Sequence, residues 1–498
     1  MKKILSAILA ACLLATLLLT LPACSKDPTP NPGEDSSAGP AQTTAEDTSY
    51  LYDENGLLKD TLPEGLTFNN TTVNVLGWQT TRNEFYVEEL TEERVNDSVY
   101  MRNKNVENRL GVKLNFNLIK GDNANRNAFV SQAEASITAG ASEYDIIGCY
   151  SMCSGILAQR GLLSDLYEVE YLDTQKPWWP ESFIRSSEIN GKLYFATGDI
   201  SNEFLYNLYF MLVNLNRVKE LQLTDPRTMI DSRGWTLDTM ISMCQDAYED
   251  LNSSQTRDAG DRFGLVIWQQ VHIDPFIAAS GVQMTRWDNN GNIVLSDEFK
   301  GERMVDIVTK LGDMLNNYEG AIYDTKNGYN TIKGGNALFG TVAGSTLTGF
   351  REVDWVYGII PFPIIDAETD KYQSLVGFAY TNFCIPTSVA DSSMSGAVIE
   401  ALASESYRRT APTLFEVMFK SSYSNDPLDS QMFDLMKSNV YVDMARLYSG
   451  NFTWANSAVA LFRNSIINGE KSWRTKITAN EDYINGVFAD ISESFKNQ

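Results

Sequence analysis

Three segments in the first third of the chain have the apolar patterning of β-strands. Residues 71–78 and 112–120 alternate apolar and polar positions, and residues 144–150 form a short apolar run that stops near Gly148. Apolar residues recur with helical spacing over 96–110, and another helix is expected before the third strand. The order strand, helix, strand, helix, strand predicts a parallel sheet with helices on its faces.

The carboxyl ends of these strands carry candidate binding residues. Ligands of open α/β sheets bind beyond the carboxyl ends of the strands. Gly77 and Trp78 end the first strand, and Cys149 and Tyr150 follow the third. We therefore expect these residues to lie near a cleft.

The middle of the chain predicts a helix and a hairpin. Thr236 is placed to cap a helix over 237–251, whose apolar residues share one face. Residues 285–296 predict a β-hairpin, because Asn290 and Gly291 supply the positive φ angles of a tight turn.

The first 49 residues have a different character. Lys2 and Lys3 precede an apolar run over 4–21, which predicts an export signal over 1–23. A permanent transmembrane helix is the alternative, because the run approaches the length of a membrane span. Pro22 and a small alanine before Cys24 favour processing instead.

The sequence Leu-Pro-Ala-Cys at 21–24 resembles a bacterial lipobox. This resemblance implies that the signal is removed before Cys24 and that Cys24 is lipidated. The rest of 24–49 is rich in Pro, Gly, Ser, Thr and acidic residues, which predicts a flexible linker. We expect a protein anchored by lipid to the extracellular face of the cell membrane.

The net charge excludes two classes of partner, and the chain length predicts two lobes. Lys and Arg total 40 against 64 Asp and Glu, a formal charge of -24. Nucleic acid and anionic lipid both require clustered cations, so neither is an expected partner. Without the signal and linker, roughly 440 residues remain, too many for one hydrophobic core and suited to two lobes.

Metal sites are not expected. His272 is the only histidine, which disfavours a Cys/His zinc site, and the hairpin loop has Ile293 and Phe299 where a calcium loop needs glycine and glutamate. Two disulfides are one interpretation of the four cysteines that follow the linker, and buried free thiols are the favoured one. These cysteines are Cys149, Cys153, Cys244 and Cys384, the first two spaced to share a helix face.

Six segments, taken in order, resemble the extracellular solute-binding proteins of ABC importers, specifically family 1, the carbohydrate and maltose-type proteins. They span most of residues 66–386. The segments are YDIIGCYSMCSGILAQRGLLSDL, NGKLYFATGD with LYFMLVN, GWTLDTM, WDNNGNIVLS, GGNALFGTVAGS, and WVYGIIPFP with SLVGFAYTNFCIP. The last hundred residues match in helical character only.

The resemblance implies a two-lobed, type II periplasmic-binding-protein-like α/β fold. Each lobe is expected to be a mainly parallel sheet flanked by helices, with a hinged cleft between the lobes. The N-terminal lobe would hold 66–200 and 356–386, and the C-terminal lobe 201–355 and 387–498. Ligand contacts to both lobes would stabilise the closed state.

Sugars present apolar faces and hydroxyl rims, so a sugar site needs flat aromatic side chains and polar partners. The expected loops carry such groups. The candidate ligand-binding residues are Trp78, Tyr150, Asp199, Trp268, Gln269, Gly344, Ser345, Thr346, Gly377, Phe378 and Tyr380. Trp287 and Trp454 are weaker candidates. Asp199 disfavours an anionic solute, although Arg82 and Arg351 could reverse that preference.

Other function classes find less support in the sequence. The chain has no Gly-x-Ser-x-Gly motif, and His272 is the only histidine available for a catalytic triad. We expect no enzyme activity and no cofactor, and retain a secreted glycoside hydrolase or a surface adhesion protein as alternatives. The favoured hypothesis is a monomeric, lipid-anchored binding subunit that delivers a mono- or oligosaccharide to ABC permease subunits.

Overall fold

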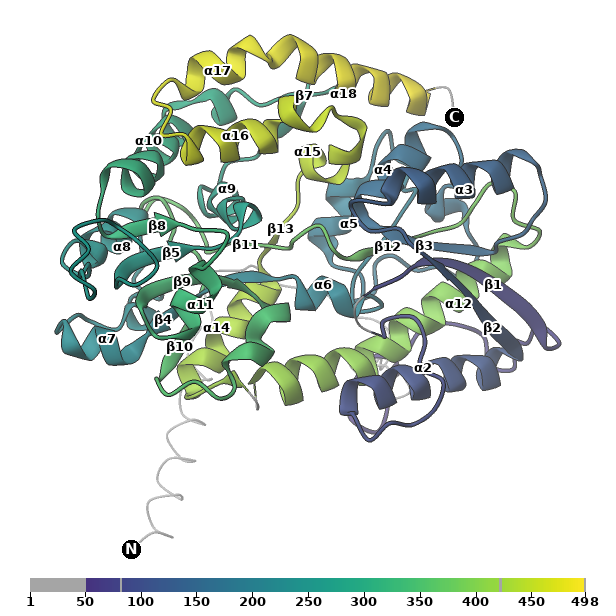
Figure 1. Cartoon of the computed structure of the whole chain (residues 1–498). Helices are drawn as coiled ribbons and strands as arrows, with labels where there is room; N and C mark the ends of the chain where they lie inside the picture. Colours follow the sequence, from purple (N-terminus) through teal and green to yellow (C-terminus); the bar gives the residue numbers. More distant parts are fainter. Residues whose placement is uncertain (1–50, 81–82, 421–422, 497–498) are drawn as a thin grey trace, which may run out of the picture. The chain divides into compact units, whose positions relative to one another are not determined.

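The computed structural model describes residues 51–80, 83–420 and 423–496 (Figure 1). The expected signal over 1–23, the lipidated Cys24 and the linker over 24–49 lie outside the described residues, as does Arg82. The elements below all belong to one unit, Leu51–Gln498.

A four-stranded sheet, called here the first sheet, contains the three strands expected early in the chain. Its spatial order is β12 (Thr381–Cys384), β3 (Ile146–Tyr150), β1 (Thr71–Trp78) and β2 (Val112–Ile119). β1 is parallel to both β2 and β3, and Thr71 lies opposite Val112. The alternation in β1 buries Val73 and Val75, as the pattern predicts.

A five-stranded sheet, called the second sheet, is mixed. Its spatial order is β10 (Tyr357–Ile360), β4 (Tyr209–Asn214), β9 (Ala337–Ala343), β5 (Phe263–Ile267) and β8 (Ala321–Tyr323). β5 is parallel to β8 and β9, whereas β4 is antiparallel to β9 and to β10. The expectation of mainly parallel sheets is therefore wrong for this sheet.

Helices surround both sheets (Figure 1). They are α2 (Arg94–Leu110), α3 (Arg126–Thr138), α4 (Ser151–Gln159), α5 (Glu181–Ser187), α6 (Asn202–Tyr206), α7 (Leu215–Glu220), α8 (Leu237–Cys244), α9 (Pro275–Ala279), α10 (Glu302–Asn317), α11 (Gly328–Lys333), α12 (Ser392–Glu405), α14 (Pro427–Ser438), α15 (Met444–Leu447), α16 (Ala458–Ile467), α17 (Trp473–Ala479) and α18 (Glu481–Lys496). None of the helices among the described residues has the length and apolarity that a membrane crossing requires.

The chain passes between the two sheets more than once. α6 connects the first sheet to β4, and a return segment over 376–380 leads from β11 (Ser374–Leu375) to β12. Leu208 forms a β-bridge with Val376, so the outgoing and returning segments lie side by side. β12 enters the first sheet antiparallel to β3 because it arrives from the second sheet.

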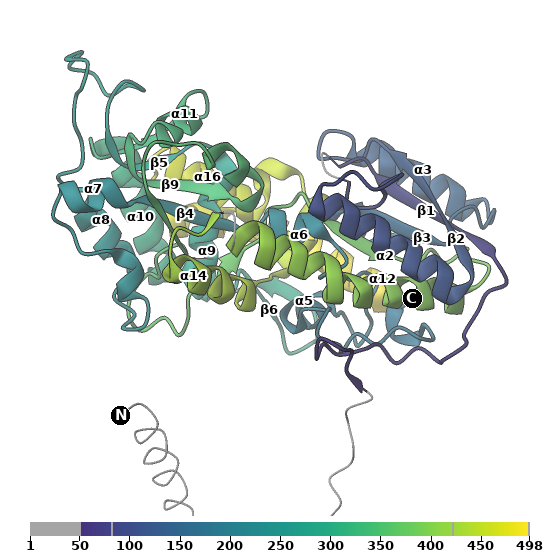
Figure 2. The same ribbon diagram turned by 90° about the horizontal axis from the view of Figure 1, so that it is seen from below.

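Two segments differ from the expected lobe boundaries. β10 pairs with β4 in the second sheet, although 356–386 was expected with the N-terminal lobe. α12 packs beside α2, although 387–498 was expected with the C-terminal lobe (Figure 2). Asn105 of α2 donates to Glu405 of α12 at 2.9 Å. Sequence motifs could not predict these contacts because strand pairing and helix docking are long-range.

Local predictions had mixed outcomes. Thr236 caps α8 as expected, but the helix ends at Cys244 rather than near 251. β6 (Thr285–Trp287) and β7 (Ile293–Leu295) form the expected hairpin, in which Gly291 adopts positive φ. The four cysteines of the described residues are buried and free, which confirms the favoured interpretation. Cys149 is in β3 and Cys153 in α4, so they share no helix face.

Candidate functional site

Trp78 belongs to a buried polar cluster, called here the Glu84 network, which consists of Trp78, Glu84, Ser201 and Thr381. The Trp78 indole N–H donates to the Thr381 hydroxyl at 2.8 Å, and that hydroxyl donates to Glu84 at 2.6 Å. Ser201 donates to the other oxygen of Glu84. Trp78 is only 4% exposed, so its side chain packs against other parts of the protein.

Burial controls the protonation of Glu84. Desolvation, together with repulsion from Glu203, raises the pKa of Glu84 to about 7, although hydrogen bonds from Ser201 and Thr381 oppose the shift. Glu84 therefore exchanges a proton near neutral pH.

Tyr150 and Tyr209 meet where the chain passes between the sheets. Tyr150 ends β3 and Tyr209 begins β4. Burial raises the pKa of Tyr150, and the nearby Tyr209 raises it further. A Cβ added at Gly377 would lie 2.5 Å from the Tyr209 hydroxyl oxygen, so only glycine permits this approach. The return segment is held by the Gly377 N–H, which donates to the Asn207 carbonyl at 2.8 Å.

Three charged side chains next to this crossing form what we call the arginine cluster: Asp274, Arg446 and Arg463. Asp274 is fully buried and accepts from Arg446 at 2.6 Å and from both Nε and Nη2 of Arg463, the latter at 2.5 Å. Arg446 also donates to the Val376 carbonyl at 2.9 Å. Burial lowers the pKa of Arg463, but Asp274 outweighs this effect and raises it above its usual value.

Helix capping positions the two arginines. The Asp443 carboxylate caps α15 by accepting from the Ala445 N–H at 2.8 Å, and it also accepts from the Met284 N–H at 2.8 Å. This links the start of α15 to the strand region near β6, and Arg446 follows one turn later. Ser457 caps α16, on which Arg463 lies.

Half-buried aromatic rings cover the arginine cluster. The Arg446 guanidinium lies 4.1 Å from the Phe378 ring centroid, and that of Arg463 lies 4.8 Å from the Trp454 centroid. The Phe378 and Trp454 rings are 6.2 Å apart and nearly perpendicular. Such cation–π contacts orient the guanidinium planes.

Trp268 provides a further aromatic surface after β5. Its ring packs edge-on against His272 at 5.2 Å and tilts against Tyr329 at 5.1 Å. The Trp268 indole N–H is buried, and no acceptor for it lies among the described residues. His272 bonds to Thr341 at 3.0 Å, and burial lowers the pKa of His272 to about 3, so its ring is neutral near pH 7.

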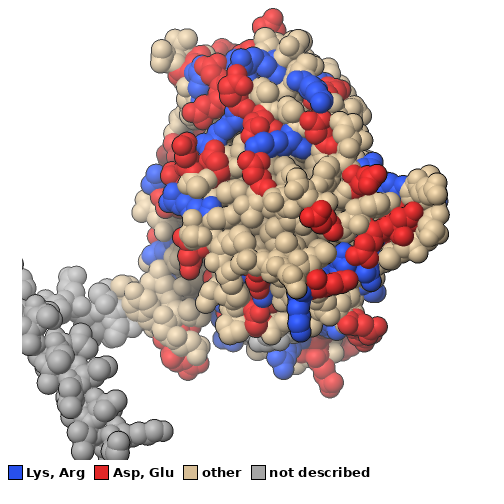
Figure 3. Space-filling model, turned by 90° about the vertical axis from the view of Figure 1, so that its left-hand side faces the viewer, with Lys and Arg blue, Asp and Glu red and all other residues tan. Residues whose placement is uncertain are grey.

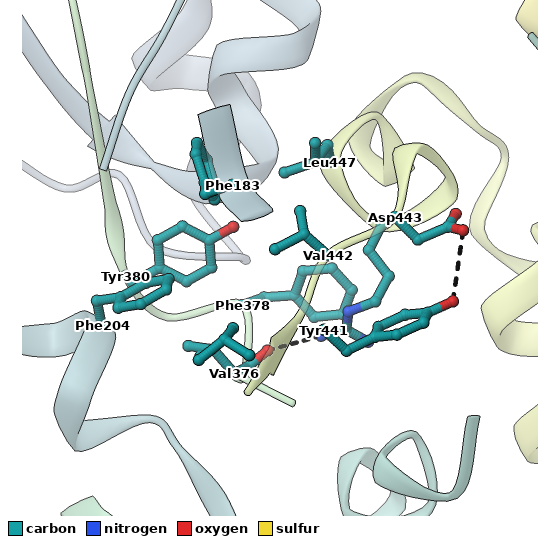
Figure 4. A pocket seen from close by; sticks show the side chains of 11 residues that line it. Phe183, Phe204, Val376, Phe378, Tyr380, Tyr441, Val442, Asp443 and Leu447 are labelled. Atoms are coloured by element: carbon teal, nitrogen blue, oxygen red, sulfur yellow. Dashed lines mark hydrogen bonds between the residues drawn. The ribbon is translucent and has the colours of Figure 1, made fainter. Parts of the chain in front are cut away.

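A small cavity lies beside Phe378 and Arg446 (Figure 4). In Figure 4, Phe378 lies in the middle of the group, between Tyr380 on one side and Tyr441 on the other. The cavity volume of about 20 Å³ suffices for one water molecule. A saccharide therefore requires the surrounding segments to separate.

Asp199 lies in a different and wider hollow of about 790 Å³, which we call the Asp199 hollow. Lys437 approaches Asp199 at 3.9 Å, and apolar side chains such as Leu205 and Leu208 line part of the hollow. Burial raises the pKa of Asp199, with Lys437 opposing the shift. The Asp199 hollow adjoins the cavity beside Phe378, because Phe204, Val376 and Val440 line both.

The remaining candidates occupy four places. Gly344, Ser345 and Thr346 begin the 3₁₀ helix η6 (Gly344–Phe350) after β9, and the Thr346 hydroxyl donates to the Ala343 carbonyl at 2.8 Å. Tyr380 is buried edge-on against Phe204. Gln269 follows Trp268 and is half-buried. Trp287 is 44% exposed on the hairpin.

Sequence reasoning missed the three members of the arginine cluster and undervalued Trp454. Arg446 and Arg463 lie in the last hundred residues, where no motif marks them. Asp274 follows Trp268 by six positions, and its proximity to the end of β5 is the one signal that could have found it. Arg351, considered as a ligand contact, lies instead over the Tyr423 ring at 5.1 Å.

Charged residues on the surface are mixed in sign. On the face shown in Figure 3, acidic and basic side chains are interspersed around an area of uncharged residues. Within the described ranges, no group of three or more His, Cys, Asp or Glu side chains is arranged to hold a metal ion.

Comparison with known proteins identifies the fold. No protein-family model and no curated protein matches the chain. Solved structures do match. The cyclic α-maltosyl-1,6-maltose binding protein from Arthrobacter globiformis superposes with a TM-score of 0.56 at 12% identity, covering 84% of this chain and 99% of that one. This chain has the fold of the type II periplasmic binding proteins.

Two further structures agree. The GacH receptor of Streptomyces glaucescens, solved unliganded and with acarbose, has a TM-score of 0.53 at 14% identity, over 84% of this chain and 99% of that one. An ABC substrate-binding protein from Listeria monocytogenes, in complex with cycloalternan, has a TM-score of 0.51 at 11% identity over the same shares. These type II neighbours are sugar-binding proteins, and at such identities the likeness concerns the fold.

Proposed function

We propose that this protein is the substrate-binding lipoprotein of an ABC importer. It would be anchored through Cys24 to the outer face of the membrane, capture a mono- or oligosaccharide between its two sheets, and deliver it as a monomer to the membrane permease. The observation that carries the proposal is the pair of half-buried rings, Phe378 and Trp454, that lie over the guanidinium groups of Arg446 and Arg463.

Physical chemistry supports this assignment. Aromatic faces stack on the C–H faces of sugar rings, and buried N–H donors satisfy sugar hydroxyls. Residues of both sheets contribute, because Tyr150 ends a strand of the first and Trp268 follows a strand of the second. A ligand that contacts both sides stabilises the closed arrangement, which an importer can recognise.

Thermal denaturation against a panel of sugars, polyols, peptides and sugar phosphates tests this function. A ligand at 100 times its Kd stabilises the protein by about 2.7 kcal/mol, which shifts the melting temperature visibly. We expect a saccharide to raise the melting temperature and to be recovered unchanged. Product formation would favour a glycoside hydrolase, and stabilisation by a polymer or protein alone would favour an adhesion protein.

A pair of variants locates the site. Trp268→Ala should weaken the sugar-induced shift, whereas Asp199→Asn in the Asp199 hollow should leave it unchanged. The opposite result would move the binding site to that hollow.

A further inference from the structure

The arginine cluster contains more positive than negative charge. Arg446 and Arg463 are 7% and 3% exposed, and the one carboxylate that both contact is Asp274. Two guanidinium groups and one carboxylate leave one positive charge without a partner. Burying an unpaired charge is costly, so such an imbalance is unusual in a protein interior.

Arg102 is buried and bonds to backbone carbonyls and polar side chains, with no carboxylate of the described residues bonded to it, whereas two other buried arginines are better balanced. Arg227 pairs with three carboxylates, those of Asp225, Asp426 and Asp429. Arg217 pairs with Glu220 and Glu249. Each of these two arginines has at least two carboxylates, whereas in the arginine cluster two arginines share one.

A second buried carboxylate, Asp443, lines the same cavity as Arg446. It accepts from groups other than Arg446 and Arg463, and burial raises its pKa, which favours its uncharged form. Its donors are the Met284, Thr285 and Ala445 N–H groups and the Thr285 and Tyr441 hydroxyls.

Tyrosines beside the cluster contribute no negative charge. Tyr150, Tyr209, Tyr323 and Tyr380 all have a pKa raised by burial, so their hydroxyls remain protonated. Arg126 also acts on Tyr150 and adds to the positive potential there.

The hydrogen bonds to Asp274 and Val376 use some, but not all, of the N–H donors of the two guanidinium groups. Arg463 uses Nε and Nη2 on Asp274, and Arg446 uses Nη1 on Asp274 and Nη2 on Val376. The bonds to Asp274 and Val376 leave Nη1 of Arg463 and Nε of Arg446 available to a ligand. The planar arrangement of such N–H groups suits carboxylate and phosphate oxygens.

We propose that the ligand of this site is an anionic saccharide, a uronic acid or a sugar phosphate, whose charged group is bound by Arg446 and Arg463. This inference rests on the proposed function and gives its substrate class. It reverses the expectation that Asp199 disfavours an anionic solute, because Arg446 lines the cavity beside Phe378 whereas Asp199 lines only the adjoining hollow.

The test compares matched pairs of ligands on the full protein by isothermal titration calorimetry. The pairs are galacturonic acid with galactose, glucuronic acid with glucose, glucose 6-phosphate with glucose, and the corresponding disaccharides with and without a uronic acid. In at least one pair, the anionic member should bind about tenfold or more tightly than its neutral parent. Its Kd should rise between about 0.05 and 0.5 M NaCl, as expected for an ion pair.

Substitutions of Arg463 test whether the arginine cluster causes the preference for anionic ligands. Arg463→Gln should reduce the preference for the anionic member to about one, and Arg463→Lys, which preserves the charge and hence the fold, should reduce it partly. Arg185→Gln removes an exposed arginine that pairs with Glu181 and should change nothing. Far-UV circular dichroism and the unliganded melt verify folding of each variant.

The outcomes separate the two proposals. Neutral parents that bind as tightly as their anionic partners would overturn the anionic inference and leave the sugar-binding function standing. An anionic preference unchanged in Arg463→Gln would also overturn it. Failure of every saccharide, neutral or anionic, to bind would overturn the proposed function itself.

Discussion

The Glu84 network and the arginine cluster are both buried and polar, yet they use their hydrogen-bonding capacity differently. In the Glu84 network, each donor and acceptor named above has its partner inside the protein, from the Trp78 indole to the Ser201 hydroxyl. In the arginine cluster, two guanidinium groups share the single carboxylate of Asp274. Burial is therefore common to both groups, and the ratio of charged groups and hydrogen-bond partners is what differs between them.

The largest effect is expected at Trp78. Trp78→Ala should lower the free energy of unfolding by about 3 to 5 kcal/mol, because it leaves a cavity and removes the indole N–H that donates to the Thr381 hydroxyl. Urea denaturation followed by circular dichroism measures this loss. Unchanged stability with lost sugar binding would instead make Trp78 a ligand contact and remove the contrast between the two clusters.

Glu84 should make stability depend on pH. Its pKa is about 7 in the folded protein against an ordinary value of 4.5, so the folded state binds more protons between these values. The free energy of unfolding is highest below about pH 4.5 for this group and falls by about 3 kcal/mol as pH rises to about 7. Urea denaturation at several pH values measures the slope.

A matched variant isolates the contribution of Glu84. Buried Glu400, whose pKa is raised to about 8, adds a slope of the same sign in both proteins. Glu84→Gln should therefore flatten the profile between about pH 4.5 and 7 without abolishing it. Identical slopes in the two proteins would show that Glu84 is charged throughout.

Trp268 should contribute less than Trp78 to stability and more than Trp78 to sugar binding. Trp268→Ala should cost about 1 kcal/mol of unfolding free energy, through the lost contacts with His272 and Tyr329, and should remove most of a sugar-induced melting shift. Trp287→Ala, on the exposed hairpin, is the control and should alter neither quantity. A loss of stability as large as that of Trp78→Ala would assign Trp268 to the core.

The smallest effect concerns the cysteines. Burial raises the pKa of Cys149, Cys153 and Cys244, and all four cysteines of the described residues lack a disulfide. A thiol reagent should therefore leave them unmodified in the native protein and react with them in denaturant. Rapid modification under native conditions would reveal an opening at the end of β3, close to Tyr150.

The sequence predicted much of the fold, because periodicity is a local signal. The alternation over 71–78 and the helical spacing over 96–110 correspond to β1 and α2, and Asn290-Gly291 marks the hairpin. The helix after Thr236 was predicted too long, because Leu251 is 48% exposed and adds nothing to the apolar face.

The site was predicted only in part, because its chemistry is assembled from distant segments. Phe378 and Trp268 were selected from neighbouring motifs, and their contact with a ligand stays a prediction. Asp274 and Arg463 are 189 positions apart, and their pairing depends on the docking of α16. Trp78 and Trp268 have similar places at strand ends in the sequence, but the structure buries Trp78 and bonds it to Thr381, whereas Trp268 is half-buried.

The order of segments along the chain has a consequence for biosynthesis. β12, at one edge of the first sheet, is made of residues 381–384, and both arginines of the cluster follow it. During translation, an emerging chain would hold β1, β2 and β3 long before either guanidinium group exists. The arginine cluster therefore forms only after nearly the whole polypeptide has been made, and a product truncated before Arg463 would lack one of the two partners of Asp274.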